Sequence, residues 1–295
     1  MNRSGYPLKF QIDEIILRSI DEDLNTGDAT TDALIPTDIS TEASIVSKDE
    51  GILAGGNMAI EVFHHLDPAI KVNFLLDDGT RLQHHDPENQ TPNSIIAKIE
   101  GNVGNILRGE RIAINLLQHL SGIATQTNTF VQAIEHLPAK IVDTRKTLPG
   151  LRMLQKYAVR VGGGINHRIN LADGILIKDN HIKILAREKL DLESIVNKAR
   201  QHARHPLKIE VEVESISQVK DAIKAGADIL LLDNMSIKDM TEAVTIIDGK
   251  AMTEASGNID ISNVRNVAET GVDLISIGRL THSSSALDIS LDLIG

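Results

Sequence analysis

The sequence predicts an α/β protein, a (β/α) barrel preceded by an α+β domain, and two observations support this. In the second half, short apolar segments that end in polar residues alternate with amphipathic helical segments. This alternation is typical of βα units with a parallel sheet. In the first third, the apolar segments are irregular and separated by polar, turn-rich stretches, which indicates mixed helices and strands.

The predicted barrel strands are short, mostly apolar segments with a charged or small residue at the end or directly after it. They are Lys140–Asp143, Gly174–Lys178, Lys208–Val213, Asp228–Asp233 and Asp273–Ile277. Helices are predicted between them. In the stretch 216–225 the apolar residues share one helical face and Gly226 ends the helix, and 264–271 repeats the pattern. A series of such units favours a barrel.

The N-terminal part is predicted to contain two short helices and several loops. These are the helices Ile12–Ile20 and Met58–His65, an acidic loop at Glu22–Asp28, a turn at Gly51–Gly56 and a polar loop at Gly79–Asn93. A long helix is predicted from Gly109 to His136, either bridging the two parts or opening the barrel.

The composition excludes several classes of protein. With 295 residues, 41% hydrophobic and 24% charged, the chain is typical of a globular protein, and no apolar run approaches the ~20 residues of a membrane span. It has no cysteine, which excludes disulfides, thiolate nucleophiles and cysteine-ligated metals. A net charge of -11 and 2% aromatic residues argue against nucleic-acid binding. A cytoplasmic location is expected.

One stretch of this acidic chain is basic. Its charged residues are Arg145, Lys146, Arg152, Lys156, Arg160, Arg168 and Lys178 against a single acid, Asp173. Such a one-sided cluster indicates a binding site for a polyanion.

Polar residues also follow one predicted strand after another, where barrel enzymes place their chemistry. They are Asp143 with Arg145 and Lys146, then Lys178, Glu212, Asp233, Ser256–Gly257 and Gly278. At a single strand, such residues would simply mark the point where the strand meets water. A whole series of them favours a site.

Eleven segments carry a resemblance to a known family. They are Glu22–Asp28, Gly109–Leu116, His119–Thr125, Asp143–Arg152, Gln155–Arg160, Gly162–Arg168, Ile177–His181, Glu210–Glu212, Leu231–Asn234, Glu254–Asn258 and Gly271–Gly278. In this order, over nearly the whole chain, they resemble quinolinate phosphoribosyltransferase (decarboxylating) of NAD biosynthesis, also called nicotinate-nucleotide pyrophosphorylase (carboxylating). The departures, Asn25 and His84–Asp86, fall in predicted loops.

The resemblance implies an open (β/α) TIM-like barrel with an N-terminal α+β domain. The barrel is expected to span 109–281, and the other domain 1–108 together with the C-terminal segment of about 282–295. A last helix near Leu287–Leu291 is expected to pack on the N-terminal domain. The resemblance further implies a homodimer, in which the N-terminal portion of one subunit covers the barrel mouth of its partner.

The implied acceptor, quinolinate, carries two adjacent carboxylates, which guanidinium groups bind bidentately. The residues that the resemblance assigns to quinolinate are Arg145, His167, Arg168 and, acting from the partner subunit, Arg111. Lys146 and Lys178 are expected near both substrates, and Thr144 is a further expected substrate-binding residue. For Arg152 and Arg160, binding and a purely structural role both stay open.

The implied donor, phosphoribosyl pyrophosphate, works with Mg²⁺, which takes one or two carboxylates plus phosphate oxygens. Glu212 and Asp233 close successive predicted strands and are the expected metal ligands, although either could hold ribose hydroxyls or pair with Lys178. The predicted catalytic residues are Lys146, Lys178, Glu212 and Asp233.

The 5′-phosphate of the donor is expected at two late loops. Ser256–Gly257–Asn258 and Ile277–Gly278–Arg279 follow the last barrel strands, and their small residues let peptide N–H groups approach an anion. Gly162–Gly164 could be only a flexible turn, or could bring the backbone close to the ligand.

Two other functions stay open from the sequence. A relative with the same fold and phosphoribosyl site could use another acceptor, as the similar nicotinate-specific and molybdenum-associated proteins suggest. A non-catalytic binding or scaffolding protein could share the fold, because fold alone does not fix function.

Overall fold

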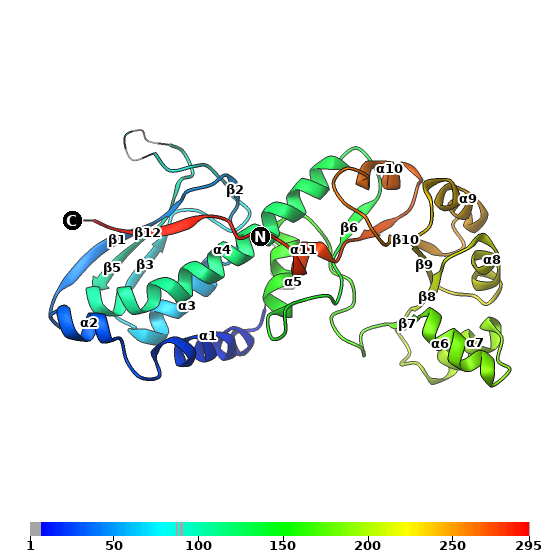
Figure 1. Ribbon diagram of the computed structural model, residues 1–295, viewed down its shortest axis with the longest axis horizontal. Helices are drawn as coiled ribbons and strands as arrows, with labels where there is room; N and C mark the ends of the chain where they lie inside the picture. Colours follow the sequence, from blue (N-terminus) through cyan, green and yellow to red (C-terminus); the bar gives the residue numbers. More distant parts are fainter. Residues whose placement is uncertain (1–6, 87, 89–90, 295) are drawn as a thin grey trace. The chain divides into compact units, whose positions relative to one another are not determined.

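The computed structural model describes residues 7–86, 88 and 91–294 (Figure 1). These residues form two compact units. The first unit runs to Asn128 and includes Thr147–Gly163 and the chain from Leu280 onward, and the second comprises Thr129–Lys146 and Gly164–Arg279. The predicted domain boundary at residue 109 lies inside a long helix of the first unit.

The first unit contains a four-stranded antiparallel sheet with the order β12-β1-β5-β3. Its strands are β1 (Ser40–Ser47), β3 (Lys71–Phe74), β5 (Ile95–Asn102) and β12 (Ile289–Ile294). A second, two-stranded sheet pairs β2 (Gly51–Ile52) with β4 (Arg81–Leu82). The predicted turn at 51–56 therefore begins with a strand. The predicted loop at 79–93 contains one as well, and its residues 87, 89 and 90 lie outside the described residues.

The helix expected near Leu287–Leu291 was a wrong prediction, because this segment forms the edge strand β12. Apolar and polar residues alternate from Ile289 to Leu293, which is the period of a strand. In the ladder Ile289 lies opposite Ser47 and Leu291 opposite Ile45 of β1. The end of the chain thus completes the sheet of the first unit.

Within the described part of the chain, six helices have most or all of their residues in the first unit. They are α1 (Lys9–Leu24), α2 (Ala29–Leu34), α3 (Gly56–Leu66), α4 (Val103–Ala133), α5 (Arg152–Val161) and α11 (Arg279–His282). Buried residues of α4, among them Ile106, Leu117 and Leu120, recur at helical spacing and enter the core. The predicted helices at 12–20, 58–65 and 109–136 are confirmed. Despite the length of α4, no helix within the described residues is apolar enough to cross a membrane.

The second unit is built on a six-stranded parallel sheet with the order β6-β11-β10-β9-β8-β7 (Figure 1). Its strands are β6 (Lys140–Val142), β7 (Ile175–Ile177), β8 (Ile209–Val213), β9 (Ile229–Asp233), β10 (Met252–Ser256) and β11 (Leu274–Ser276). β7 follows β6 along the chain but lies at the opposite edge of the sheet, so the barrel is open. This confirms the predicted fold class, an open α/β barrel accompanied by an α+β unit.

Helices follow the strands of this sheet. They are α6 (Asp179–Arg187), α7 (Leu192–His202), α8 (Ile216–Lys224), α9 (Ile237–Ile247) and α10 (Val264–Glu269). Side-chain caps fix the starts of three of them: Asp191 accepts from the N–H of Ser194, Ser215 from that of Gln218, and Ser236 from that of Asp239. Because all the strands are parallel, the polar residues at their carboxyl ends gather along one edge.

Candidate active site

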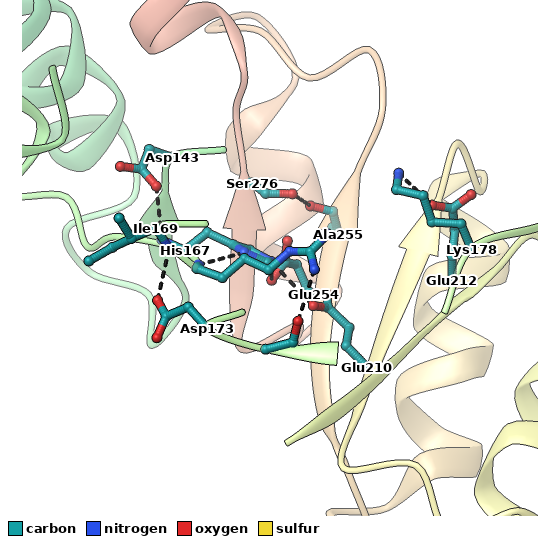
Figure 2. Close-up of polar contacts among 12 residues, drawn as sticks. Asp143, His167, Ile169, Asp173, Lys178, Glu210, Glu212, Glu254, Ala255 and Ser276 are labelled. Atoms are coloured by element: carbon teal, nitrogen blue, oxygen red, sulfur yellow. Dashed lines mark hydrogen bonds and ion pairs between the residues drawn. The ribbon is translucent and has the colours of Figure 1, made fainter. Parts of the chain in front are cut away.

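Asp143, directly after β6, anchors one side of the candidate site. Its side chain is fully buried. Its Oδ1 accepts the backbone N–H of His167 at 2.8 Å (Figure 2). Its Oδ2 accepts an N–H from Nδ2 of Asn166 at 2.7 Å. One buried carboxylate thus ties the turn at 166–168 to the end of β6, where the sequence also places Arg145 and Lys146.

Arg168 is held at both its backbone and its guanidinium. Its backbone N–H donates to Nδ1 of His167 at 2.7 Å, and its Nη1 donates to the carbonyl oxygen of Gly174 at 2.9 Å. Burial and, second, the charge of Arg145 lower the pKa of Arg168, an effect that Glu210 opposes. Two arginines from different loops therefore lie close enough to repel each other, and an anion bound between them would relieve that repulsion.

Two buried glutamates face the ring of His167 (Figure 2). Its Nε2 lies 3.3 Å from Oε2 of Glu210 on β8 and 3.6 Å from Oε2 of Glu254 on β10. Burial, followed by the charge of Glu210, raises the pKa of Glu254 to about 7. Neither of these two acids was among the site residues predicted from the sequence. The available signal was a carboxylate in the middle of an apolar strand, which is costly unless it has a partner.

The predicted pair Lys178 and Glu212 lies in the same unit (Figure 2). Lys178 follows β7, and its Nζ lies 3.2 Å from Oε2 of Glu212 on the adjacent strand β8. Asp233 ends β9, and Glu212, Glu214 and Asp233 can each place one carboxylate oxygen within 4.8 Å of the others. The structure therefore brings the two predicted metal-binding acids together, and adds Glu214 to them.

The loops after β9 and β10 are joined by a pair of asparagines. Nδ2 of Asn258 donates to Oδ1 of Asn234 at 3.0 Å, and both residues have left-handed backbones, with φ of 49° and 53°. Gly257, which precedes Asn258, has φ of 96° and lies against the side chain of Asn234. Non-glycine residues in this conformation store strain, a feature that clusters at ligand sites.

Gly257→Ala tests how closely this loop is packed. A Cβ at this position would lie 2.2 Å from Oδ1 of Asn234, so the asparagine pair must separate. We expect the midpoint of thermal unfolding to fall by roughly 4 °C or more, the effect of at least 1–2 kcal/mol of strain. The matched control is Gly226→Ala, since Gly226 has a similar left-handed φ but nothing within 4 Å of an added Cβ. Equal shifts by calorimetry would show that the contact with Asn234 is unimportant.

In the second predicted phosphate loop, Ile277–Gly278–Arg279, the first backbone N–H already has a partner within the sheet. The N–H of Ile277 donates to the carbonyl oxygen of Val142 at 2.9 Å, so it continues the sheet and is not available to an anion in this arrangement. Gly278 is half-buried, and Arg279 is exposed at the start of α11. An anion at this loop would therefore meet the residues after Ile277.

The remaining predicted residues divide between the two units. In the second unit, Oγ1 of Thr144 accepts the N–H of the exposed Lys146 at 3.0 Å. Arg111 is exposed on α4, and Arg152 and Arg160 lie on α5, so these three arginines belong to the first unit. Arg152 donates from Nε to Oγ1 of Thr147 at 3.0 Å. The other predicted residues surround the carboxyl ends of one parallel sheet.

Comparisons with known proteins cover the whole of this architecture. The family model "Quinolinate phosphoribosyl transferase, N-terminal domain" matches residues 28–121, and the corresponding C-terminal domain model matches 123–292. The chain is 44% identical over 272 residues to a Bacillus subtilis (strain 168) protein named "Probable nicotinate-nucleotide pyrophosphorylase (carboxylating)", covering 92% of this chain and 90% of the relative.

A plant relative and a solved structure show the same similarity over most of their length. The chain is 37% identical over 300 residues to quinolinate phosphoribosyltransferase (decarboxylating) 2b, mitochondrial, of Nicotiana tabacum, covering 96% of this chain and 82% of the relative. The structure of nicotinate-nucleotide pyrophosphorylase from Francisella tularensis matches with a TM-score of 0.90 and 40% identity, over 98% of this chain and 99% of that one. With both domain models matched and these relatives similar over nearly their full length, the chain belongs to the quinolinate phosphoribosyltransferase family.

Proposed function

We propose that this protein transfers the phosphoribosyl group of phosphoribosyl pyrophosphate to quinolinate, with decarboxylation, in NAD biosynthesis. The products are nicotinate mononucleotide, pyrophosphate and CO₂. One observation supports the proposal beyond family membership. In a chain of net charge -11, Arg145, Lys146 and Lys178 follow strands of the parallel sheet, and the charge of Arg145 acts on Arg168. Both substrates are polyanions, and this is the charge that they require.

The acceptor subsite is assigned to the arginines that repel each other. Arg145 and Arg168 present two guanidinium groups, and quinolinate presents two adjacent carboxylates, so each group can make paired N–H···O hydrogen bonds. Lys146, exposed beside them, adds a point charge. Asp143 supports this assignment because it fixes the turn that carries Arg168 to the strand that precedes Arg145.

The reaction needs positioning and positive charge rather than a covalent nucleophile. The pyridine nitrogen of quinolinate attacks C1 of the ribose while the bond to pyrophosphate breaks, and the leaving group keeps the electron pair. The C2–carboxylate bond then breaks, CO₂ departs, and the electron pair left at C2 takes a proton from water. Lys178 holds positive charge near the phosphates, and preorganised charge of this kind stabilises a developing anion.

We also propose that Mg²⁺ binds at the cluster of carboxylates beside Lys178. Glu212, Glu214 and Asp233 offer carboxylate oxygens, the ligand type that Mg²⁺ prefers, close enough to share one ion. We assign Glu212 and Asp233 as its ligands or as the residues that hold its water shell. When bound, the ion would neutralise the pyrophosphate of the donor. The loops with Gly257 and Gly278 are proposed to receive the 5′-phosphate.

A homodimer with a shared site is also proposed, with Arg111 of one subunit acting at the partner's barrel. Its support is the exposed arginine on α4 within a segment that resembles the family. A cytoplasmic location is part of the same proposal, since a chain without cysteine suits a reducing compartment.

Mixing subunits tests the shared site. Arg111→Ala and Lys178→Ala homodimers should each be nearly inactive, but a heterodimer of the two keeps one intact composite site. We expect about half of the unsubstituted activity per mixed dimer, since it has one working site in two. Differently tagged subunits, purified by both tags, give the measurement. Inactive mixed dimers would exclude action of Arg111 in trans.

The choice of acceptor can be tested by calorimetric titration of the free protein. Quinolinate should bind at least about tenfold more tightly than nicotinate, which lacks the 2-carboxylate and so loses one charge-assisted pair of hydrogen bonds. Equal affinities would point to a different acceptor. Tight binding of both substrates without turnover of the ternary mixture would favour a non-catalytic binding protein.

A further inference from the structure

The hydrogen bonds of His167 fix which ring nitrogen carries the proton. Nδ1 accepts the backbone N–H of Arg168 at 2.7 Å, so its lone pair is occupied and it holds no proton. The proton must then be on Nε2, the nitrogen that faces the carboxylates of Glu210 and Glu254 at 3.3 and 3.6 Å. The ring is oriented from both sides.

The same hydrogen bonds exclude a metal at this cluster. His167, Glu210 and Glu254 can bring three ligand atoms within 4.8 Å of one another. A metal on Nε2, however, requires the proton on Nδ1, and Nδ1 faces a donor instead. The glutamates therefore meet an N–H group and not a cation.

Each of the two glutamates keeps one carboxylate oxygen without a hydrogen-bond partner within the described residues. The two residues are only 4% and 1% exposed, and that oxygen is the buried Oε1 in each. Burying two carboxylates with so few donors is costly, which argues for a use beyond packing. The groups that they face are the imidazole of His167, the hydroxyl of Ser276 beside Glu254 and, through the charge of Glu210, the guanidinium of Arg168.

We propose that Glu210 and Glu254 are positioning residues for the acceptor subsite, holding the His167 ring so that its Nδ1 fixes the backbone of Arg168. Asp143 holds the backbone of His167 from the other side, so this residue is fixed at both its backbone and its ring. The charge of Glu210 offsets the repulsion between the two arginines while no substrate is bound. That quinolinate is the acceptor rests on the proposed function. Which nitrogen of the His167 ring carries the proton does not depend on it.

Nitrogen NMR on the unsubstituted protein tests the ring directly. With ¹⁵N-labelled histidine, and His167 assigned from the spectrum of His167→Asn, we expect a protonated Nε2 and an unprotonated Nδ1 at neutral pH. Added Zn²⁺, which is diamagnetic, should cause no shift of the size that direct coordination to Nε2 produces. A proton on Nδ1, or a shift or broadening showing metal on Nε2, would overturn the proposal. This result does not depend on whether quinolinate is a substrate.

Kinetics of two variants at one position test the positioning role. Glu254→Gln keeps an oxygen that can accept Nε2–H, whereas Glu254→Leu does not. We expect the leucine variant to raise KM for quinolinate about tenfold with KM for phosphoribosyl pyrophosphate within about twofold, and the glutamine variant to restore it. The control is Glu242→Gln, an exposed carboxylate on α9.

Two outcomes would contradict the role of Glu254. A glutamine variant no better than leucine would show that the contact between the Glu254 oxygen and Nε2 of His167 is unimportant. A parallel rise in both KM values would indicate general damage to the fold. Thermal unfolding of each variant identifies such damage. If the leucine variant does not fold, the proposal is tested by the NMR measurement of the His167 ring in the unsubstituted protein. No turnover of quinolinate by the unsubstituted protein would instead count against the proposed function.

Discussion

Arg145→Lys should lower kcat/KM for quinolinate by about 10- to 100-fold even though the charge is kept, the loss expected when one charge-assisted hydrogen bond is removed. Arg145 is half-buried in the loop after β6, and its charge acts on Arg168. A guanidinium group can make two parallel hydrogen bonds to one carboxylate, but an ammonium group binds as a point charge. The shorter reach of lysine also moves the charge away from the acceptor.

Initial rates at saturating phosphoribosyl pyrophosphate give this value. The matched control is Arg265→Lys on α10, where an exposed arginine pairs with Glu269 one helical turn away. A lysine there keeps the pair, and kcat/KM should be unchanged. Near-normal kcat/KM for quinolinate in Arg145→Lys would contradict the bidentate assignment.

Lys178→Ala should reduce kcat by about 100- to 1000-fold, the range seen when one preorganised group that stabilises transition-state charge is removed. The loss has two parts. Positive charge near the leaving pyrophosphate disappears, and Glu212, whose side chain is 10% exposed, loses the ammonium group at 3.2 Å. The remaining carboxylate adds negative charge where the donor's phosphates must bind.

Lys183→Ala is the control for this prediction. Lys183 lies on α6, is 71% exposed and pairs with Asp179 in an i,i+4 geometry. Its loss removes the same charge from the same unit but leaves the ammonium group of Lys178 in place beside Glu212. Its kcat should stay within about twofold of the unsubstituted value, as expected for an exposed pair. If the two variants lost activity equally, net charge rather than the position of Lys178 would explain the effect.

The parallel barrel could be predicted because its signals are local. Apolar strands, helical faces and polar residues at the strand ends all lie within short windows, and the strands at 140–142, 175–177, 209–213, 229–233 and 274–276 match their predicted segments. β12 was missed although the alternation from Ile289 to Leu293 is visible, because the expectation of a final helix came from resemblance and not from the pattern.

The buried part of the site was harder to predict. Glu210 and Glu254 are separated by β9 in the sheet, and both meet a histidine from a turn that lies far away along the chain. Their roles depend on which strand face points inward and on which loop covers it, and both are settled by tertiary packing. The hydrogen bond from the N–H of Ile277 could not be predicted for the same reason, because its acceptor, the carbonyl oxygen of Val142, lies on another strand.

The central claim is tested most directly by a turnover assay that follows CO₂ and nicotinate mononucleotide together. The protein is mixed with phosphoribosyl pyrophosphate, Mg²⁺ and either quinolinate or nicotinate. We expect equal amounts of CO₂ and mononucleotide from quinolinate, and no mononucleotide from nicotinate. Turnover of nicotinate, or of neither acceptor, would leave the barrel fold intact but contradict the assignment of a dicarboxylate acceptor to Arg145 and Arg168.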